Sequence, residues 1–323
     1  MSSISSFTLR FIIDRPVSFQ SFSGFASCGI FYNLIRSVDE CLAEKLHSSK
    51  KLAPWASSPL ILEYPSRVVY RRLPAPSIAK VSFTIMDDKL CEVFKQTILR
   101  SQLYVELVNV KAKVIGVSVN TYKFSDLASS SKPLPERFAV RFLTPTAFRR
   151  SIYDCCPSCP HYLEYLCAVK RGRRMDEPCK HAVKCMRVVV PLPIPSLMFK
   201  NLARLWSAFS KVSLDVWSAA RWAENALMIA GFPKPGIWTV RVYEHPTTNK
   251  WIVGFMGTVR FAVRREVYDE RKAKIATALL RMAEMTNVGL RRTAGLGMIR
   301  SFNSLDENHN LAFQTPTGFY MMG

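Results

Sequence analysis

The chain has 323 residues, with 45 Lys and Arg against 24 Asp and Glu, giving a formal net charge of +21. Apolar residues make up 49% of the sequence, enough for buried cores, which excludes disorder for most of the chain. No window approaches the roughly 18 consecutive apolar residues of a membrane-spanning helix. Arg10 and Asp14 come too early for a secretory signal, so we expect a cytoplasmic protein. The charge predicts a polyanionic partner, with nucleic acid the first candidate.

The N-terminal part predicts a strand, two helices and then further strands. Residues Phe7–Ile13 form an apolar run that begins with alternation, which favours a strand. From Ser23 to Ile35 the apolar spacing becomes helical, and Ser37 followed by Glu40 has the capping-box pattern that starts a second helix, ending near His47. We then expect short strands near 60–64, 68–71 and 81–85, a helix over 87–99, and one or two strands over 104–119.

The C-terminal part predicts a second mixed unit. Residues 127–136 are rich in Ser and Pro and are the predicted linker. The elements expected after it are a strand over 138–143, helices over 196–209 and 214–229, strands near 238–243 and 251–262, a long helix over 269–285 and a last strand. Each part fits a split β-α-β, ferredoxin-like unit. The sequence therefore predicts an α+β protein with tandem domains at 1–126 and 137–323.

Six of the nine cysteines crowd into residues 155–185, inside a predicted Cys-rich insert at 151–186 of the second domain. Cys156 and Cys159 have the spacing of a common metal knuckle, and Cys179 and Cys185 complete a tetrahedral set. Alternative ligands are Cys155, His161, Cys167 and His181. We predict structural zinc here, with disulfides and an iron–sulfur cluster as open alternatives.

A Gly-containing turn, residues 287–297, lies between the long helix and the last strand. Its glycines let backbone N–H groups approach a phosphate, and Arg291 and Arg292 add charge. The surrounding string R-M-A-E-M-T-N-V-G-L-R-R-T-A-G-L-G-M-I-R resembles the C-terminal signature of the CRISPR-associated repeat-cleaving endoribonucleases, the Cas-six type of the RAMP superfamily. Asn287 replaces the first glycine of this signature, and asparagine tolerates left-handed backbone, so we expect the turn to persist.

Other segments match the same family in the expected order. They are G-F-M-G at 254–257, F-L-T-P-T at 142–146 with the proline-rich 191–199, and, near the N-terminus, 30–35 and 46–52. The resemblance implies two ferredoxin-like (RRM-like) domains. It also implies cleavage within the repeats of CRISPR precursor RNA, with no cofactor for catalysis. In that reaction a ribose 2′-OH attacks the adjacent phosphate and leaves a 2′,3′-cyclic phosphate and a 5′-OH.

By the match, Tyr32, His47 and Lys51 fall on the family's base, acid and charge-stabilising positions. Lys50 is the alternative lysine, because the match requires a one-residue gap. A tyrosine acts as a base only if its pKa of about 10 is lowered or its proton is relayed. The structural interpretation stays open: Tyr32 as a core aromatic, His47 as a complement to a helix dipole.

Predicted RNA contacts are Gly289, Arg291, Arg292, Gly295 and Gly297. Residues 260 to 300 include ten basic and four acidic residues, and this excess of positive charge favours a groove that follows an RNA backbone. The predicted partner is CRISPR repeat RNA, and effector-complex subunits or a second copy in a homodimer are further candidates. The alternative function is a non-catalytic RNA-binding subunit of an effector complex. A zinc-containing DNA-binding regulator is disfavoured, since no recognition-helix motif is present.

Overall fold

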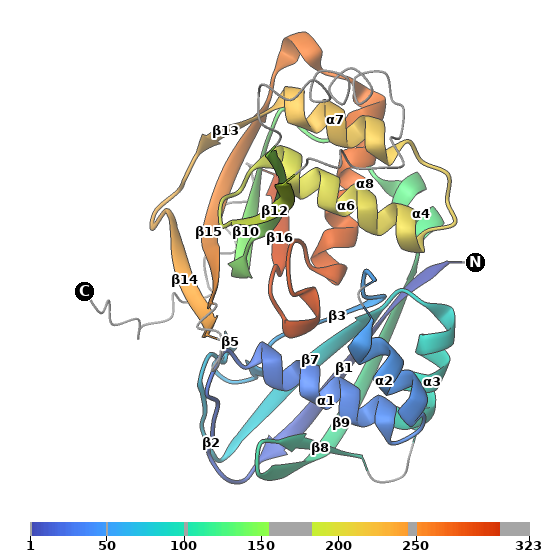
Figure 1. Cartoon of the computed structure of the whole chain (residues 1–323), viewed down its shortest axis with the longest axis vertical. Coiled ribbons are helices and arrows are strands. Elements are labelled where there is room, and N and C mark those ends of the chain that lie inside the picture. The colour runs from blue at the N-terminus through green and yellow to red at the C-terminus, as the bar shows by residue number, and fades with distance from the viewer. Residues whose placement is uncertain (1, 50, 100–102, 155–182, 245–250, 304–323) are drawn as a thin grey trace.

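The computed structural model describes residues 2–49, 51–99, 103–154, 183–244 and 251–303. Figure 1 shows an N-terminal and a C-terminal half, each with a sheet that carries helices on one face. The N-terminal half contains β1 (Ser3–Ile13), β2 (Val17–Ser18), α1 (Gly24–Arg36), α2 (Glu40–Ser48), β3 (Trp55–Ser57), β4 (Ile61–Leu62), β5 (Arg67–Val68), β6 (Arg72–Leu73), β7 (Ser77–Ile85), α3 (Asp88–Ile98), β8 (Tyr104–Leu107), β9 (Val110–Lys123) and α4 (Phe124–Ser130).

The N-terminal sheet is antiparallel, with the order β5-β4-β7-β1-β9-β8 and β3 also paired to β7. Strand β1 lies at its centre, where Phe7 pairs with Phe83 on one side and with Val119 on the other. Alternate β1 residues face α1 and α3 and are fully buried, which is the pattern of a sheet covered on one face. Consecutive central strands are therefore joined through helices rather than through tight hairpins.

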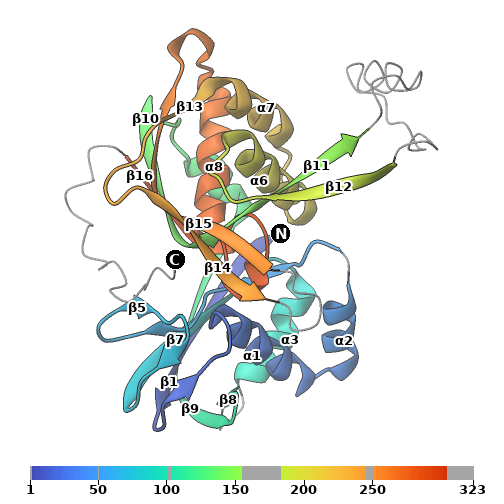
Figure 2. The same ribbon diagram turned by 60° about the vertical axis from the view of Figure 1, so that its left-hand side comes forward.

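The C-terminal half repeats this order of connections. It contains β10 (Arg137–Thr146), β11 (Phe148–Asp154), β12 (Val183–Val190), α6 (Pro195–Phe209), α7 (Val216–Ala226), β13 (Leu227–Gly231), β14 (Ile237–Glu244), β15 (Trp251–Val263), η1 (Arg265–Val267), α8 (Glu270–Thr286), η2 (Arg292–Ala294) and β16 (Ile299–Asn303). Its sheet has the order β13-β15-β10-β16, with β14 also on β15. Strands β11 and β12 form a separate ribbon that extends away from the sheet (Figure 2).

Most predicted helices begin where the sequence places a capping residue. Asp87 and Asp269 accept the N–H groups of Leu90 and Lys272 and start α3 and α8 as expected. The capping box of Ser37 and Glu40 is wrong: Asp39 caps α2 by accepting from Leu42 N at 2.8 Å. The Ser37 hydroxyl instead donates to Leu34 O, at the end of α1. Two helices thus meet at a junction of only three residues.

Two other expectations change because tertiary contacts override local pattern. The predicted helix 214–229 ends at Ala226, since Leu227 and the residues after it pair with β15 as β13. The predicted linker 127–136 begins inside α4, and Leu127 and Leu134 are buried in the C-terminal core. That segment is packed against α8 rather than extended between the halves. Within the described residues no helix is long and apolar enough to cross a membrane.

Candidate active site at the junction of the two halves

The Gly-containing turn packs between the two halves. Figure 1 shows it as the loop after α8, directly above α1 and β3. Arg292 points inward: its side chain is 4% exposed, and its guanidinium donates to Thr286 O and to Ala53 O, both at 2.9 Å. Burial lowers the pKa of Arg292 to about 10, so this side chain remains charged at neutral pH. Because Ala53 belongs to the N-terminal half, Arg292 ties that half to the turn.

Asn287 adds a second tie across the same junction. Its side-chain amide donates to Ser57 O at 2.8 Å and to Arg292 O at 3.2 Å, and the Ser57 hydroxyl donates to Thr293 O. Asn287 ends α8 with φ 60° and ψ 169°, a positive φ that a residue with a side chain rarely adopts. The turn persists with asparagine because its amide gains two buried acceptors.

The predicted phosphate cradle does not form from the three glycines. Their N–H groups are used inside the protein: Gly289 donates to Asn201 Oδ1, Gly295 to Arg292 O and Gly297 to Pro145 O. A side chain on Gly295 would overlap the backbone of Pro59, so glycine is needed here for close packing of the two halves.

Arg292 likewise requires correction as an RNA contact, because its guanidinium is buried on backbone carbonyls. Among the five predicted RNA contacts, Arg291 alone has an exposed side chain. The turn therefore separates two adjacent arginines by function, one structural and one facing outward.

Tyr32 and His47 come together where α1 and α2 meet. Their ring centroids lie 5.4 Å apart with the planes at 74°, an edge-to-face contact. Trp55 meets the Tyr32 ring from another side at 5.6 Å. His47 is exposed in the last turn of α2, whereas Tyr32 is partly buried. Sequence analysis missed Trp55, since only folding brings the start of β3 beneath the end of α1.

Electrostatics at this junction keeps Tyr32 protonated. Burial raises the pKa of Tyr32 to about 12, the neighbouring Cys28 also raises it, and the positive charge of Arg291 lowers it. Burial raises the pKa of the Cys28 thiol to about 11, against the lowering effects of a hydrogen bond with Thr293 and of the Arg291 charge. Tyr32 is therefore a neutral phenol at physiological pH. A base role for Tyr32 requires either a lowered pKa or a relay of its proton. The pKa is raised, so only the proton relay remains as a route.

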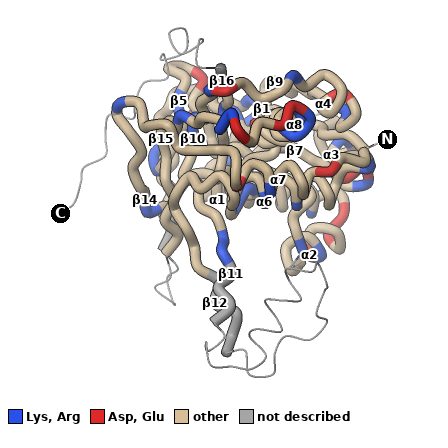
Figure 3. The backbone as a smooth tube through the Cα atoms, turned by 90° about the horizontal axis from the view of Figure 1, so that it is seen from above, with Lys and Arg blue, Asp and Glu red and all other residues tan. Residues whose placement is uncertain are grey.

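Positively charged side chains lie at the junction and elsewhere on the molecule. Lys51 is exposed just after α2, and Lys50 lies outside the described residues. Figure 3 shows further Lys and Arg positions spread over the molecule, including β11 and β14. Arg149 and Arg150 are exposed at the base of the β11–β12 ribbon. Arg241 lies over the exposed ring of Trp251, 3.6 Å from its centroid. These groups suit a long, flexible polyanion better than a compact ligand.

The predicted zinc site cannot be placed in the fold. Cys156, Cys159 and Cys179 lie outside the described residues, and nothing is described of the Cys185 side chain in β12. In the described part of the chain, no group of three or more His, Cys, Asp or Glu side chains is arranged to hold a metal ion. Cys28, Cys41 and Cys91 are free thiols. The zinc hypothesis stays a prediction.

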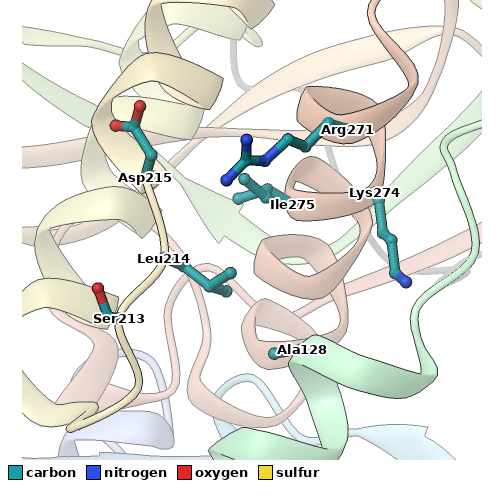
Figure 4. A pocket seen from close by; sticks show the side chains of 7 residues that line it. All are labelled: Ala128, Ser213, Leu214, Asp215, Arg271, Lys274 and Ile275. Carbon is teal, nitrogen blue, oxygen red and sulfur yellow. The ribbon is translucent and has the colours of Figure 1, made fainter.

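A shallow hollow of about 430 Å³ lies in the C-terminal half, away from the Tyr32–His47 pair. It is lined by Ala128, Ser213, Leu214, Asp215, Arg271, Lys274 and Ile275. In Figure 4 Arg271 extends from α8 across the hollow, while Lys274 points away from it. The charged side chains that line this hollow, Asp215, Arg271 and Lys274, are all exposed, so the hollow lacks the enclosed charged groups of a catalytic pocket.

The whole fold matches solved structures of Cas6 proteins. Thermus thermophilus Cas6 (TTHB231) has a TM-score of 0.61 with this chain at 19% identity, covering 94% of this chain and 99% of that one. A Cas6 (TTHB231) product complex has a TM-score of 0.67 at 18% identity, covering 94% and 100%. A Cas6 (TTHA0078) product complex has a TM-score of 0.63 at 18% identity, covering 93% and 100%. The fold is thus that of the Cas6 proteins, a mixed α/β arrangement.

The sequence places the chain more closely. The family model described as CRISPR-associated endoribonuclease Cas6 matches residues 140–299, from β10 through the Gly-containing turn to the start of β16. Comparison with curated proteins gave no match. This match confirms the resemblance of the C-terminal signature to the Cas6 type of CRISPR-associated endoribonucleases.

Proposed function

We propose that the chain is an endoribonuclease that cleaves CRISPR repeat RNA to generate guide RNAs. The observation that carries this proposal is the Tyr32–His47 pair, 5.4 Å between ring centroids, at a junction completed by the signature turn of a Cas6-type chain. The description of the matching family model, an endoribonuclease, supports an RNA substrate, and two Cas6 proteins with the same fold have been solved as product complexes. The repeated strand order supports two ferredoxin-like domains, at 1–126 and 137–323, with the packed segment 127–136 between them.

The proposed reaction is transesterification. The ribose 2′-oxygen attacks phosphorus as its proton leaves, a P–O2′ bond forms, and the P–O5′ bond breaks as the 5′-oxygen takes up a proton. The products are a 2′,3′-cyclic phosphate and a 5′-OH. Histidine exchanges protons near neutral pH, so His47 is the proposed acid. Lys51, or its neighbour Lys50, supplies charge beside the pentacoordinate phosphate.

Tyr32 needs a modified role in this scheme. Since burial holds the phenol neutral, direct abstraction of the 2′-proton by a Tyr32 phenolate is disfavoured. A neutral phenol can still accept the 2′-proton in concert with passing its own proton on, or donate a hydrogen bond to a phosphate oxygen. The edge contact with the exposed His47 ring gives such a relay a neighbour that can exchange protons.

The raised pKa of Tyr32 also supports a second candidate function, a non-catalytic RNA-binding subunit of a CRISPR effector complex. Incubation of the purified chain with labelled repeat RNA separates the two. The endoribonuclease predicts a cut that persists in EDTA and is lost in His47→Ala. Tight binding without a cut under any condition favours the non-catalytic subunit. Cleavage that survives combined loss of Tyr32, His47, Lys50 and Lys51 contradicts the site.

A further inference from the structure

Arg291 combines exposure with a costly backbone conformation. It has φ 54° and ψ 38°, in the left-handed region, and the described residues with positive φ that are not glycine are Val108, Asn287 and Arg291. This region is disfavoured for any residue with a Cβ atom. Such a residue keeps this conformation only where the surrounding contacts hold its backbone in place. A glycine would adopt this conformation without the penalty, so the sequence keeps an arginine side chain at a conformational cost.

The turn fixes Arg291 from both sides. Its carbonyl accepts the N–H groups of Ala294 at 2.9 Å and of Leu296 at 3.4 Å. The next residue, Arg292, is anchored on Ala53 O in the N-terminal half. Gly295 approaches the backbone of Pro59 so closely that no side chain fits. The backbone of Arg291 is therefore held by contacts that come from both halves of the chain.

This anchoring holds Arg291 close to the helix that carries Tyr32. The turn packs against α1, where Thr293 hydrogen-bonds Cys28. Cys28 and Tyr32 are four residues apart and lie one above the other on the helix face. The positive charge of Arg291 acts on both of these side chains. Tyr32 in turn contacts the His47 ring, so three elements, the turn, α1 and α2, converge on one place.

A guanidinium here suits a phosphate. It carries a positive charge, and it presents parallel N–H donors that match two non-bridging phosphate oxygens. We propose that Arg291 binds the phosphate that is cut and stabilises the charge that develops on it during attack. The C-terminal half thereby contributes a catalytic residue to a centre whose other members lie in the N-terminal half. Arg292 is the positioning residue that sets the place of Arg291. This assignment rests on the proposed endoribonuclease function.

Single-turnover cleavage at saturating protein tests the assignment, with affinity measured separately on repeat RNA that has a 2′-deoxy nucleotide at the cut position. We expect Arg291→Gln to lower the cleavage rate by about 10²–10³-fold, the usual loss for one donor to a developing oxyanion, and the affinity by less than about tenfold. Arg291→Lys should recover part of the rate. Arg221→Gln, an exposed arginine on α7, is the matched control and should cleave at the wild-type rate.

Arg291→Gly separates catalysis from folding. It removes the left-handed penalty, so its melting temperature should equal or exceed that of the wild type, yet its cleavage rate should fall as far as that of Arg291→Gln. A wild-type rate at saturation in Arg291→Gln, with only weaker affinity, overturns the proposal and leaves Arg291 as a binding residue. If the wild-type chain itself cuts no repeat RNA, the proposed function fails first, and this assignment fails with it.

Discussion

Asn287 offers a test of how the signature turn is stabilised. Its backbone, at φ 60° and ψ 169°, occupies a region that is normally restricted to glycine. Its amide compensates by donating to Ser57 O and Arg292 O from a side chain that is only 4% exposed. Two substitutions separate these effects. Asn287→Ala removes the hydrogen bonds and keeps the strain, whereas Asn287→Gly removes both.

The two effects differ enough in size to be resolved. Two lost hydrogen bonds to buried carbonyls cost about 2–3 kcal/mol together. The backbone strain is worth about 1–3 kcal/mol, and glycine recovers it apart from about 0.5–1 kcal/mol of added chain entropy. We therefore expect Asn287→Ala to destabilise the fold by about 2–3 kcal/mol and Asn287→Gly by about half as much. The melting temperature should fall by about 4–8 °C for alanine and by clearly less for glycine.

Thermal unfolding of the purified full chain, followed by circular dichroism, measures this order. Single-turnover cleavage at a temperature where all variants are folded measures whether the turn still presents Arg291. Equal melting temperatures for the alanine and glycine variants refute the strain argument. Wild-type stability in both variants refutes the assigned value of the two hydrogen bonds.

Two further predictions concern α1. Gly24→Ala should destabilise the junction, because its Cβ would overlap the carbonyl of Ala294. Gly29→Ala in the same helix meets nothing within 4 Å and should stabilise the chain by about 0.5–1 kcal/mol, so equal melting temperatures for the two variants contradict the prediction. Folding raises the pKa of Tyr32 from 10.0 to about 12, so the unfolded chain loses this proton first. The resulting stability is complete below pH 10 and is lost as pH rises to about 12. Tyr32→Phe should therefore reduce the fall in melting temperature between pH 9 and pH 11.5, by a contribution of about 1 kcal/mol after allowance for its partial exposure; an unchanged pH dependence contradicts it.

The local pattern of apolar spacing and capping residues predicted most helices and strands, because the same residues form the caps and the buried faces in the fold. Asp87 and Asp269 stand before amphipathic runs, and both cap helices in the structure. Tyr32 and His47 were singled out by the family match of 30–35 and 46–52 and not by spacing, and their rings contact each other in the structure. Local pattern failed at Leu227, where pairing with Val263 in a distant strand ends the helix.

The sequence could not predict that Arg291 is exposed while Arg292 is buried. The two are adjacent and chemically identical, and the acceptor that buries Arg292 is Ala53, 239 positions away. Similarly, the glycines of the turn correctly predicted that another group approaches the backbone closely, but the sequence did not indicate which group. Gly295 packs against Pro59 of the protein itself instead of a phosphate. Long-range packing decides both cases, and neither leaves a local signal.

We propose above all that the junction of α1, α2 and the Gly-containing turn cuts CRISPR repeat RNA without a metal ion. The most direct measurement incubates end-labelled repeat RNA with the wild-type chain in EDTA and maps the product ends. A single cut that leaves a 2′,3′-cyclic phosphate and a 5′-OH, absent in His47→Ala, is the predicted result. No cut in EDTA with cleavage restored by Mg²⁺, or a product with a 5′-phosphate, would contradict the account.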